Sequence, residues 1–281
     1  MSQDSPNSIN WNDFEFPFSE RFESARNQAH QAAQLLGSIA RAINPEKPED
    51  THAAMIWQEA HQLLSTQMLK HHKYKYAVLN IATLSLGFQD NSDHELLSIS
   101  LAGYTNKELK QRLEEILEIK QFNLQHPYEL PTFTFGNNQP YDDSDKDYLA
   151  LCEQVFSNAY HALLPFTQSI PEASEIHIWP HHFDIATLLT YSANKSDKFI
   201  GIGLSPGDAS VPEPYFYINT WPYPKVNQQS LSPLSAGAWQ FDGWTGAILK
   251  ASEIVQSPDQ GKTVHLFLNE AFQRIKSLMF P

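Results

Sequence analysis

The sequence is poor in cysteine and in basic residues. Cys152 is the only cysteine among 281 residues, so no disulfide can form within the chain. We interpret Cys152 as a buried thiol in a helix, which fits a reducing compartment. The chain has 19 Lys and Arg against 32 Asp and Glu, a formal net charge of −13. Because nucleic acids and anionic membranes attract clustered basic residues, and no basic run occurs, we expect neither as a partner.

Long apolar runs are also missing, and we expect no secretory leader. The longest apolar runs fall well short of the roughly 18 residues that a membrane-spanning helix needs. The first residues, MSQDSPNSINWNDFEF, lack the basic and apolar regions of a signal peptide. We therefore expect a cytoplasmic protein. The chain does have 41% apolar residues, which is enough for a core in one large domain or two small ones.

Apolar periodicity predicts helices and strands along most of the chain. Thr105 and Glu108 form a capping box, the sequence signature of a helix start. The predicted helices cover 20–43, 53–69, the stretch from 105 onward, 148–166 and 263–279, and the predicted strands in the first half cover 74–88 and 95–101.

Residues 81–103 align without gaps on residues 185–207, and the similarity resumes between the stretches that begin at Gly103 and Gly243. The matched order indicates an internal duplication, with chance similarity of two amphipathic hairpins as the alternative. We predict an α+β fold made of a duplicated helix, β-hairpin and helix unit, with a mainly antiparallel sheet and helices on one face. The predicted domains are an extended arm (1–18), a first repeat (19–120), a linker (121–143) and a second, elaborated repeat (144–281) that carries the candidate site.

The stretch 176–217 contains most of the concentrated polar chemistry. Residues 176–191 and 198–204 flank turn-forming residues, which predicts an antiparallel hairpin. If Tyr191 pairs with Lys198, paired positions sum to about 389. Asp208 then falls near His182.

Side-chain alternation brings further ionisable groups to this hairpin. His182 and Asp184 share one face of the strand unless Pro180 introduces a bulge. The expected cluster is His182, Asp184, Ser205 and Asp208, with Glu213 arriving from the next loop. The aligned positions of the first copy are apolar or neutral, which indicates that only the second copy carries the ionisable residues of a functional site.

Imidazole and carboxylate groups are ligands that divalent metal ions accept, so a divalent metal ion is the candidate cofactor. Its identity stays open. We take His182, Asp184 and Asp208 as candidate metal ligands and, together with Glu213, as candidate catalytic residues of a metal-assisted hydrolase. A hydrogen-bonded network that only stabilises the hairpin is the structural alternative. A general base at His182 with Ser205 as nucleophile is a further alternative, although no nucleophile elbow surrounds Ser205.

Three glycines follow the hairpin turn without forming a phosphate loop. Gly201, Gly203 and Gly207 would need a helix after them to bind a dinucleotide, and the prolines at 212 and 214 prevent one. Residues 205–208 are most simply a tight turn.

The segment after the hairpin is dense in aromatic residues that carry a hydroxyl or an indole N–H. Such side chains suit a cleft that stacks against a sugar or another flat ligand, and core packing is the alternative. The candidate ligand-binding residues are Ser205, Tyr215, Tyr217, Trp221 and Trp244. The second function hypothesis is therefore a noncatalytic module that binds a small molecule or a partner protein. The oligomeric state stays open.

The strings WPHHFDIATL, GLSPGD, EPYFY, WPYP and GWTGAIL resemble an uncharacterised bacterial protein family with WPHHFD and SPGD motifs. The similarity runs from the helix near Glu20 to about Val255. The resemblance implies a shared fold and a shared site, and it implies no substrate or reaction.

Overall fold

A computed structural model describes residues 10–15, 18–119, 135–136, 138–193, 196–224 and 231–280. Its backbone contacts divide the chain into two compact units. The α1 unit comprises residues 19–157 and 177–184, and the α5 unit comprises residues 1–18, 158–176 and 185–281. Parts of the predicted arm (1–9 and 16–17) and of the predicted linker (121–134 and 137) lie outside the described residues. The predicted domain bounds stay a prediction.

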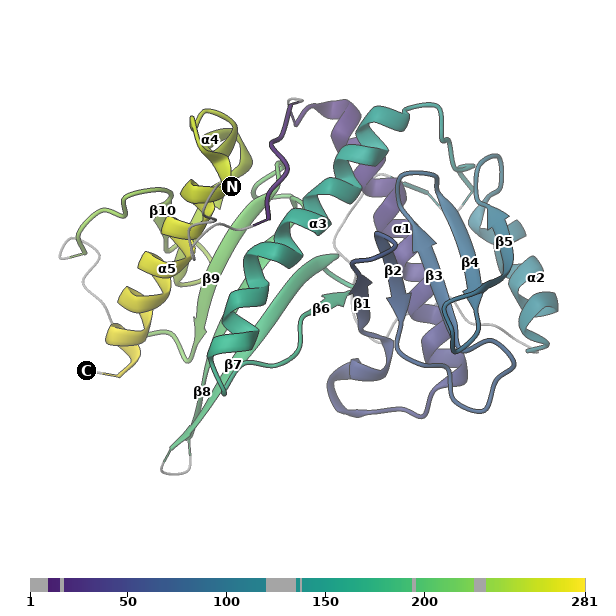
Figure 1. Cartoon of the computed structure of the whole chain (residues 1–281), viewed down its shortest axis with the longest axis horizontal. Helices are drawn as coiled ribbons and strands as arrows, with labels where there is room; N and C mark the ends of the chain where they lie inside the picture. Colours follow the sequence, from purple (N-terminus) through teal and green to yellow (C-terminus); the bar gives the residue numbers. More distant parts are fainter. Residues whose placement is uncertain are drawn as a thin grey trace, which may run out of the picture. The chain divides into compact units, whose positions relative to one another are not determined.

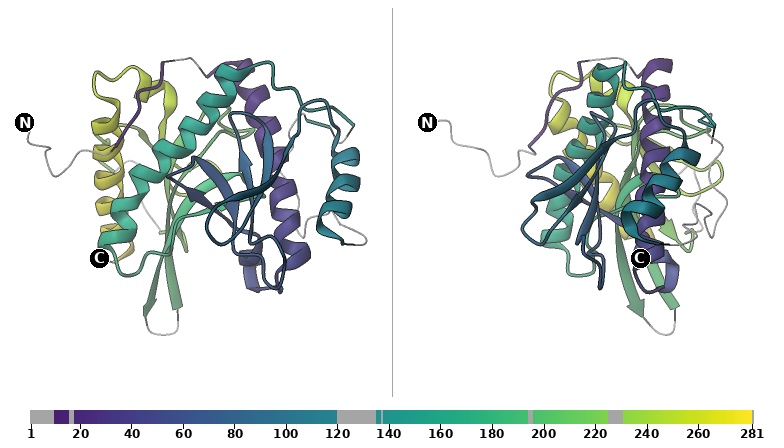
Figure 2. Two further views of the ribbon diagram at one scale, coloured as in Figure 1. Left: turned by 45° about the vertical axis from the view of Figure 1, so that its right-hand side comes forward. Right: turned by 90° about the vertical axis from the view of Figure 1, so that its right-hand side faces the viewer.

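The α1 unit is an antiparallel sheet with the long helix α1 packed on β2 and β3 (Figures 1 and 2). Its strand order is β6-β1-β2-β3-β4-β5. A row of buried apolar residues, Trp57, Leu64, Leu79, Leu86 and Ile99, crosses five of these strands in register. The elements are α1 (Glu20–Ile43), the 3₁₀ helix η1 (Pro48–Ala53), β1 (Met55–Gln58), β2 (Leu63–Thr66), β3 (Tyr76–Asn80), β4 (Ser85–Gln89), β5 (Glu95–Ser100), α2 (Asn106–Leu117) and β6 (His177–Trp179).

The α5 unit is a second antiparallel arrangement, in the order β10-β11-β9-β8-β7. Helix α5 packs on β9 and β11 (Figure 1). Ile185, Leu204, Phe216 and Leu249 form a buried row across four strands. The elements are β7 (Asp184–Ala193), β8 (Ser196–Ser205), β9 (Tyr215–Trp221), β10 (Ala238–Gln240), β11 (Gly246–Lys250), α4 (Ala251–Val255) and α5 (Gln260–Met279); the division between the units passes through α3 (Lys146–Ser169) and between Asp184 and Ile185.

The predicted hairpin register is confirmed. Tyr191 pairs with Lys198 and Ile185 pairs with Leu204, so paired positions sum to 389 along the whole β7–β8 ladder. The predicted capping box is also present, because the Thr105 hydroxyl accepts from the Glu108 amide while the Glu108 carboxylate accepts from the Thr105 amide. The helices and antiparallel strands of both units also confirm the predicted α+β class with a mainly antiparallel sheet.

Two of the predicted elements are wrong. Residues 53–69 form the hairpin β1–β2 in place of a helix, and Gln62 in its turn has a positive φ of 53°. Residues 74–88 are two strands in place of one, because the chain turns at 81–84, where Leu84 has a φ of 44°. Left-handed residues interrupt both apolar patterns, and cross-strand packing decides the structure of such short runs.

The predicted duplication finds no support in the registers of the aligned segments. Ser85 pairs with Ser100 in β4–β5, so the gapless alignment would place Leu189 opposite Leu204. Leu189 instead pairs with Ile200. The stretch aligned with α2 also begins with strand β11 and not with a helix. The two stretches therefore share a sequence pattern while adopting different local structures.

The described part of the N-terminal arm is extended and docked on the α5 unit. The Phe14 amide donates to Gln260 Oε1 at 2.9 Å, and the Trp11 ring lies 6.3 Å from the ring of Phe216. Trp11 Cβ would also lie 3.0 Å from a Cβ added at Gly261 of α5. The Phe216 side of the sheet therefore lies beneath α5 and the arm.

Candidate functional site

The WPHHFD motif (residues 179–184) forms a turn and not a continuous strand. The Phe183 amide donates to the Trp179 carbonyl at 2.7 Å, and Phe183 has a φ of 56°. A positive φ is rare for an aromatic residue and is retained only where the surroundings hold it. The turn interrupts side-chain alternation between His177 and Asp184, so the predicted continuous strand from 176 to 191 is wrong there.

Buried polar side chains of α1 hold this turn. His30 Nε2 lies 2.9 Å from the Pro180 carbonyl oxygen, and the Gln34 side-chain amide donates to the same oxygen. The His30 ring stacks on Phe183 with 5.0 Å between ring centroids and 9° between planes. His30 and Gln34 are 8% and 1% exposed. Sequence reasoning treated α1 as an ordinary amphipathic helix and missed these residues, although its run of Gln, His and Asn was a visible signal.

The two histidines of the motif have different surroundings. His182 is exposed, whereas His181 is half-buried. Burial lowers the pKa of His181 to about 4, with His182 and Arg41 acting in the same direction and Asp50 opposing them. Arg41 Nε and Nη donate to both carboxylate oxygens of Asp50, at 2.6 to 3.0 Å. His181 is therefore neutral at physiological pH.

The SPGD segment (residues 205–208) is a closed turn. Asp208 Oδ1 accepts from the amides of Ser210 and Val211 at 2.7 and 2.9 Å, and its Oδ2 accepts from the Tyr215 hydroxyl at 2.6 Å. The Ser205 hydroxyl accepts from the Gly207 amide at 3.2 Å. These bonds are those of a structural Asx turn.

Glu213 fixes the start of the short helix α4. Its carboxylate accepts from the Ser252 amide at 2.6 Å and from the Ser252 hydroxyl at 3.0 Å. A carboxylate at this position satisfies an amide that has no partner within the helix. Glu213 and Asp208 therefore both hold loop structure in the α5 unit.

The predicted catalytic and metal-binding residues are divided between the units. His182 and Asp184 belong to the α1 unit, and Asp208 and Glu213 belong to the α5 unit. Within the described ranges, no group of three or more His, Cys, Asp or Glu side chains is arranged to hold a metal ion. The metal-assisted site stays a prediction.

The predicted ligand-binding residues are related by the strand registers of the α5 unit. Tyr215 pairs with Ser205 and Tyr217 with Gly203, so these residues project to one side of the sheet, opposite to the side that carries Phe216. We call this side the glycine face. It consists of Ala186, Leu188, Thr190 and Ser192 from β7, Asp197, Phe199, Gly201, Gly203 and Ser205 from β8, Tyr215, Tyr217, Asn219 and Trp221 from β9, and Gly246, Ile248 and Lys250 from β11.

Glycines on this face make room for larger side chains of neighbouring residues. A Cβ added at Gly201 would lie 2.3 Å from Asn219 Oδ1, and one at Gly203 would lie 2.6 Å from the Tyr217 hydroxyl oxygen. A Cβ at Gly246 would lie 2.5 Å from the Trp244 ring. The side chains of Asn219, Tyr217 and Trp244 therefore lie over strand positions that only glycine leaves open.

One end of the glycine face is exposed. Trp221 is 60% exposed and Leu188 is 43% exposed. The ring of Tyr223, 45% exposed, lies 5.3 Å from that of Trp221 in an edge-on arrangement. Leu188, Asn219 and Tyr223 were absent from the predicted site. Leu188 follows from the predicted β7–β8 register, which pairs it with Gly201, and Asn219 could have been found by extending the register arithmetic to β9, because β8 and β9 pair without a break.

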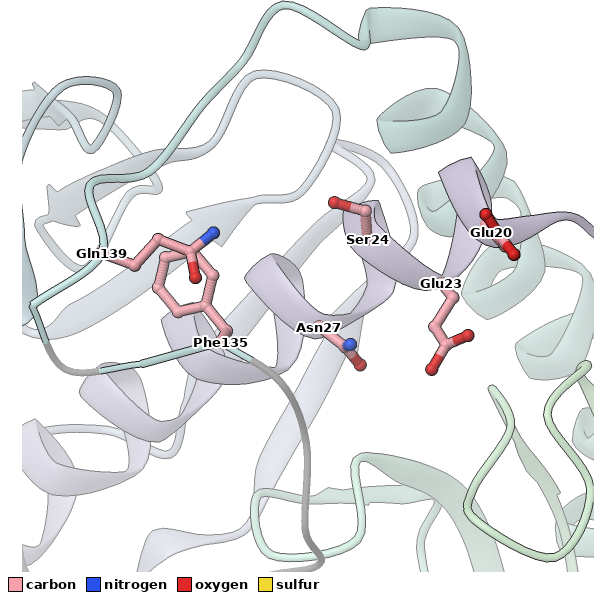
Figure 3. Close-up of a pocket in the computed structure, with 6 residues that line it drawn as sticks. All are labelled: Glu20, Glu23, Ser24, Asn27, Phe135 and Gln139. Carbon is pink, nitrogen blue, oxygen red and sulfur yellow. The ribbon is translucent and has the colours of Figure 1, made fainter.

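A cavity of about 270 Å³ lies in the α1 unit. Figure 3 shows its lining, with Phe135 and Gln139 facing the first two turns of α1. The α1 residues are Glu20, Glu23, Ser24 and Asn27. None of the predicted site residues lines this cavity, so it is separate from both motifs.

Two titratable groups of α3 lie outside both motifs. Burial raises the pKa of Cys152 to about 12, so the predicted buried thiol is correct and the thiol is unreactive at neutral pH. Burial also raises the pKa of Glu153 to about 7, against a hydrogen bond from the Ala82 amide that lowers it. No local sequence pattern marks Glu153 as a shifted group.

None of the helices in the described part of the chain has the length and apolar character needed to cross a membrane.

The described residues form an α+β protein of two units. The polar side chains of the SPGD turn are hydrogen-bonded within the α5 unit, and one partly exposed face of the sheet in that unit is rich in glycine and aromatic residues. Residues 15–279 match the model of a family of unknown function (DUF5996), and the chain belongs to this family. Neither the curated proteins nor the solved structures gave a match. The expected membership of an uncharacterised family is therefore confirmed.

Proposed function

We propose that the protein binds a small molecule at the exposed end of the glycine face. The observation that carries this proposal is the gathering of Trp221, Tyr223 and Leu188, all more than 40% exposed, beside the Asn219 amide. Ligand sites combine aromatic and apolar surface with a few polar groups that fix orientation. All five ligand-binding residues predicted from the sequence belong to this face or, for Trp244, lie over one of its glycines.

The hydrogen bonds of Asp208 and Glu213 support binding over catalysis. Asp208 accepts three hydrogen bonds from its own loop and strand, and Glu213 holds α4. A carboxylate that already accepts bonds from the backbone is a poor candidate for a proton carrier, because protonation would break the turn.

A matched pair of leucines provides a direct test. Leu188 on the glycine face and Leu266 on α5 are 43% and 47% exposed. We would measure binding of a library of small neutral metabolites by ligand-observed NMR with the wild type and with Leu188→Ala, Trp221→Ala and Leu266→Ala. Binders should lose at least about tenfold in affinity with Trp221→Ala, and several-fold with Leu188→Ala, while Leu266→Ala behaves as the wild type. Equal loss in both leucine variants, or no binder in the library, would overturn the proposal.

The metal-assisted hydrolase remains the competing hypothesis, with His182, Asp184, Asp208 and Glu213 as its residues. Metal analysis of the purified protein separates the two. A stoichiometric divalent ion that is lost with His182→Ala and with Asp208→Asn would favour the hydrolase. The excess of acidic residues continues to support a partner other than nucleic acid, and a cytoplasmic location stays a prediction.

A further inference from the structure

We infer that the small molecule bound at the exposed end of the glycine face is a neutral sugar. This inference rests on the proposed function, because it names the class of ligand for the same site. It follows from three features of the exposed end, which are its lack of basic side chains, its stacking surface and its hydrogen-bonding groups.

Asp197 is the ionisable side chain among the described face positions at the exposed end, two positions before Phe199 on β8. The face positions there are Leu188, Thr190, Ser192, Asp197, Phe199, Gly201, Asn219 and Trp221. The neighbouring Lys198 alternates to the other side of the sheet, where its ammonium donates to the Met279 carbonyl. A phosphate or carboxylate ligand would lose hydration here and would meet the like charge of Asp197, which disfavours anionic ligands, whereas sugar hydroxyls can donate to a carboxylate.

Trp221 and Tyr223 provide the stacking surface. Their planes are inclined by 82°, so the edge of one ring meets the face of the other. Such a corner leaves indole surface free for a ligand, consistent with the 60% exposure of Trp221. A sugar ring has one face of C–H groups that packs on an aromatic ring, while its hydroxyls remain at the rim.

Hydrogen-bonding groups flank this surface on both sides. Asn219 lies two positions before Trp221 on the same face, roughly 7 Å along the strand. Its amide supplies both a donor and an acceptor, the combination that matches two adjacent hydroxyls. The exposed Thr190 hydroxyl lies in the row of paired residues that also contains Phe199 and Trp221. A flat aromatic ligand would use the stacking surface and leave these groups unmatched.

Gly201 gives a way to move the amide without touching the stacking surface. The atoms closest to a Cβ at this position all belong to the Asn219 side chain, so Gly201→Ala displaces that side chain and not the backbone. Gly136, whose Cβ position has no atom within 4 Å, provides the matched control substitution, Gly136→Ala.

The test uses the full chain and three sets of probes. Maltose, cellobiose and N,N′-diacetylchitobiose are the neutral sugars, glucose 6-phosphate and galacturonate are the charged ones, and indole and adenine are flat without hydroxyls. Binding at the site is detected by the indole N–H signal of Trp221 in NMR spectra, assigned by loss of that signal in Trp221→Phe, and affinities of all variants are measured by ligand-observed NMR. At least one neutral sugar should shift the signal. Its affinity should fall at least about tenfold in Trp221→Ala and several-fold in Gly201→Ala, and stay unchanged in Gly136→Ala.

Several outcomes would overturn the inference. Some contradict only the class of ligand, and others also weaken the proposed binding site. If indole or adenine shifts the Trp221 signal and no neutral sugar does, the ligand class is wrong while the proposed site stands. If the charged sugars bind more tightly than the neutral ones, the ligand class is likewise wrong and the proposed site stands. If the sugars bind with equal affinity to Trp221→Ala, or if no probe of any set shifts the signal, the inference fails, and in the last case the proposed function loses support as well.

Discussion

The WPHHFD turn and the glycine face contrast in how their side chains are used. Pro180 and Phe183 of the turn are in contact with His30 and Gln34, which are at most 8% exposed. Trp221 of the glycine face is 60% exposed. The turn is rich in ionisable residues and held by α1, whereas the exposed end of the face is mainly aromatic and apolar, with Asp197 as its ionisable residue. A polar motif in a sequence therefore does not by itself mark a binding site, because folding can use its residues first, as the bonds of Asp208 in the SPGD turn also show.

The strongest test of this contrast removes the buried amide that holds the turn. Gln34→Ala should lower the free energy of unfolding by about 2–4 kcal/mol, because it leaves a cavity and removes a buried hydrogen bond. Gln111→Ala, at an exposed position of α2, is the matched control and should change stability by less than about 0.5 kcal/mol. Denaturant unfolding measures both. Equal effects would mean that α1 does not fix the turn.

The SPGD turn should respond in the same way, with a smaller effect. Asp208→Ala removes acceptors for two amides and for the Tyr215 hydroxyl, and should cost about 1–3 kcal/mol. Asp208→Asn retains an acceptor for the turn and should cost less than half as much. Thermal unfolding of both variants, combined with Tyr215→Phe in a double-mutant cycle, isolates the hydroxyl contact. An Asp208→Ala protein as stable as the wild type would show that this carboxylate is not structural.

A pH-dependent effect is expected from Glu153 in the α1 unit. The pKa of Glu153 is raised to about 7, so the folded state binds a proton that the unfolded state releases above about pH 4.5. Stability is then lost as pH rises from about 4.5 to 7. Glu153→Gln should therefore be more stable than the wild type at pH 8, by about 1–2 kcal/mol for a half-buried group, and nearly equal to it at pH 4.5.

His181 acts with the opposite sign in an overlapping window. Its pKa is lowered to about 4, so the unfolded state binds the proton first and stability falls as pH drops below about 6.5. This contribution is common to the wild type and Glu153→Gln, and it cancels in their difference. A stability difference that does not change between pH 4.5 and pH 8 would contradict the role given to Glu153.

The smallest stability effect is expected on the glycine face. Trp221→Ala removes a large but mostly exposed ring, so the free energy of unfolding should change by no more than about 0.5 kcal/mol. Urea unfolding of this variant beside Gln34→Ala compares the two regions directly. A loss of more than about 2 kcal/mol in Trp221→Ala would show that the ring is structural, and the contrast between the regions would disappear.

Local rules predicted much of the fold. The β7–β8 register followed from the turn between Tyr191 and Lys198, and the capping box at Thr105 fixed the start of α2. These features depend on neighbouring residues only. The short apolar runs around Trp57 and Leu79 were less predictable, because helix and strand compete there and pairing with distant strands decides.

The candidate site was predictable only in part. Alternation along β9 places Tyr215, Tyr217 and Trp221 on one side, and that much was available from the sequence. The reversal at Phe183 was not, because its positive φ depends on contacts with α1, roughly 150 positions away in the chain. The same distance hid the roles of His30 and Gln34.

The sequence alone determined the acidic character of the protein, its lack of disulfides, the β7–β8 hairpin and the aromatic residues of β9, since each depends on composition or on near neighbours. Tertiary structure alone decided which polar groups are hydrogen-bonded within the protein and which aromatic side chains stay exposed to water. The reason is physical: burial and hydrogen bonding depend on segments that meet only after folding, and no local pattern records where they meet.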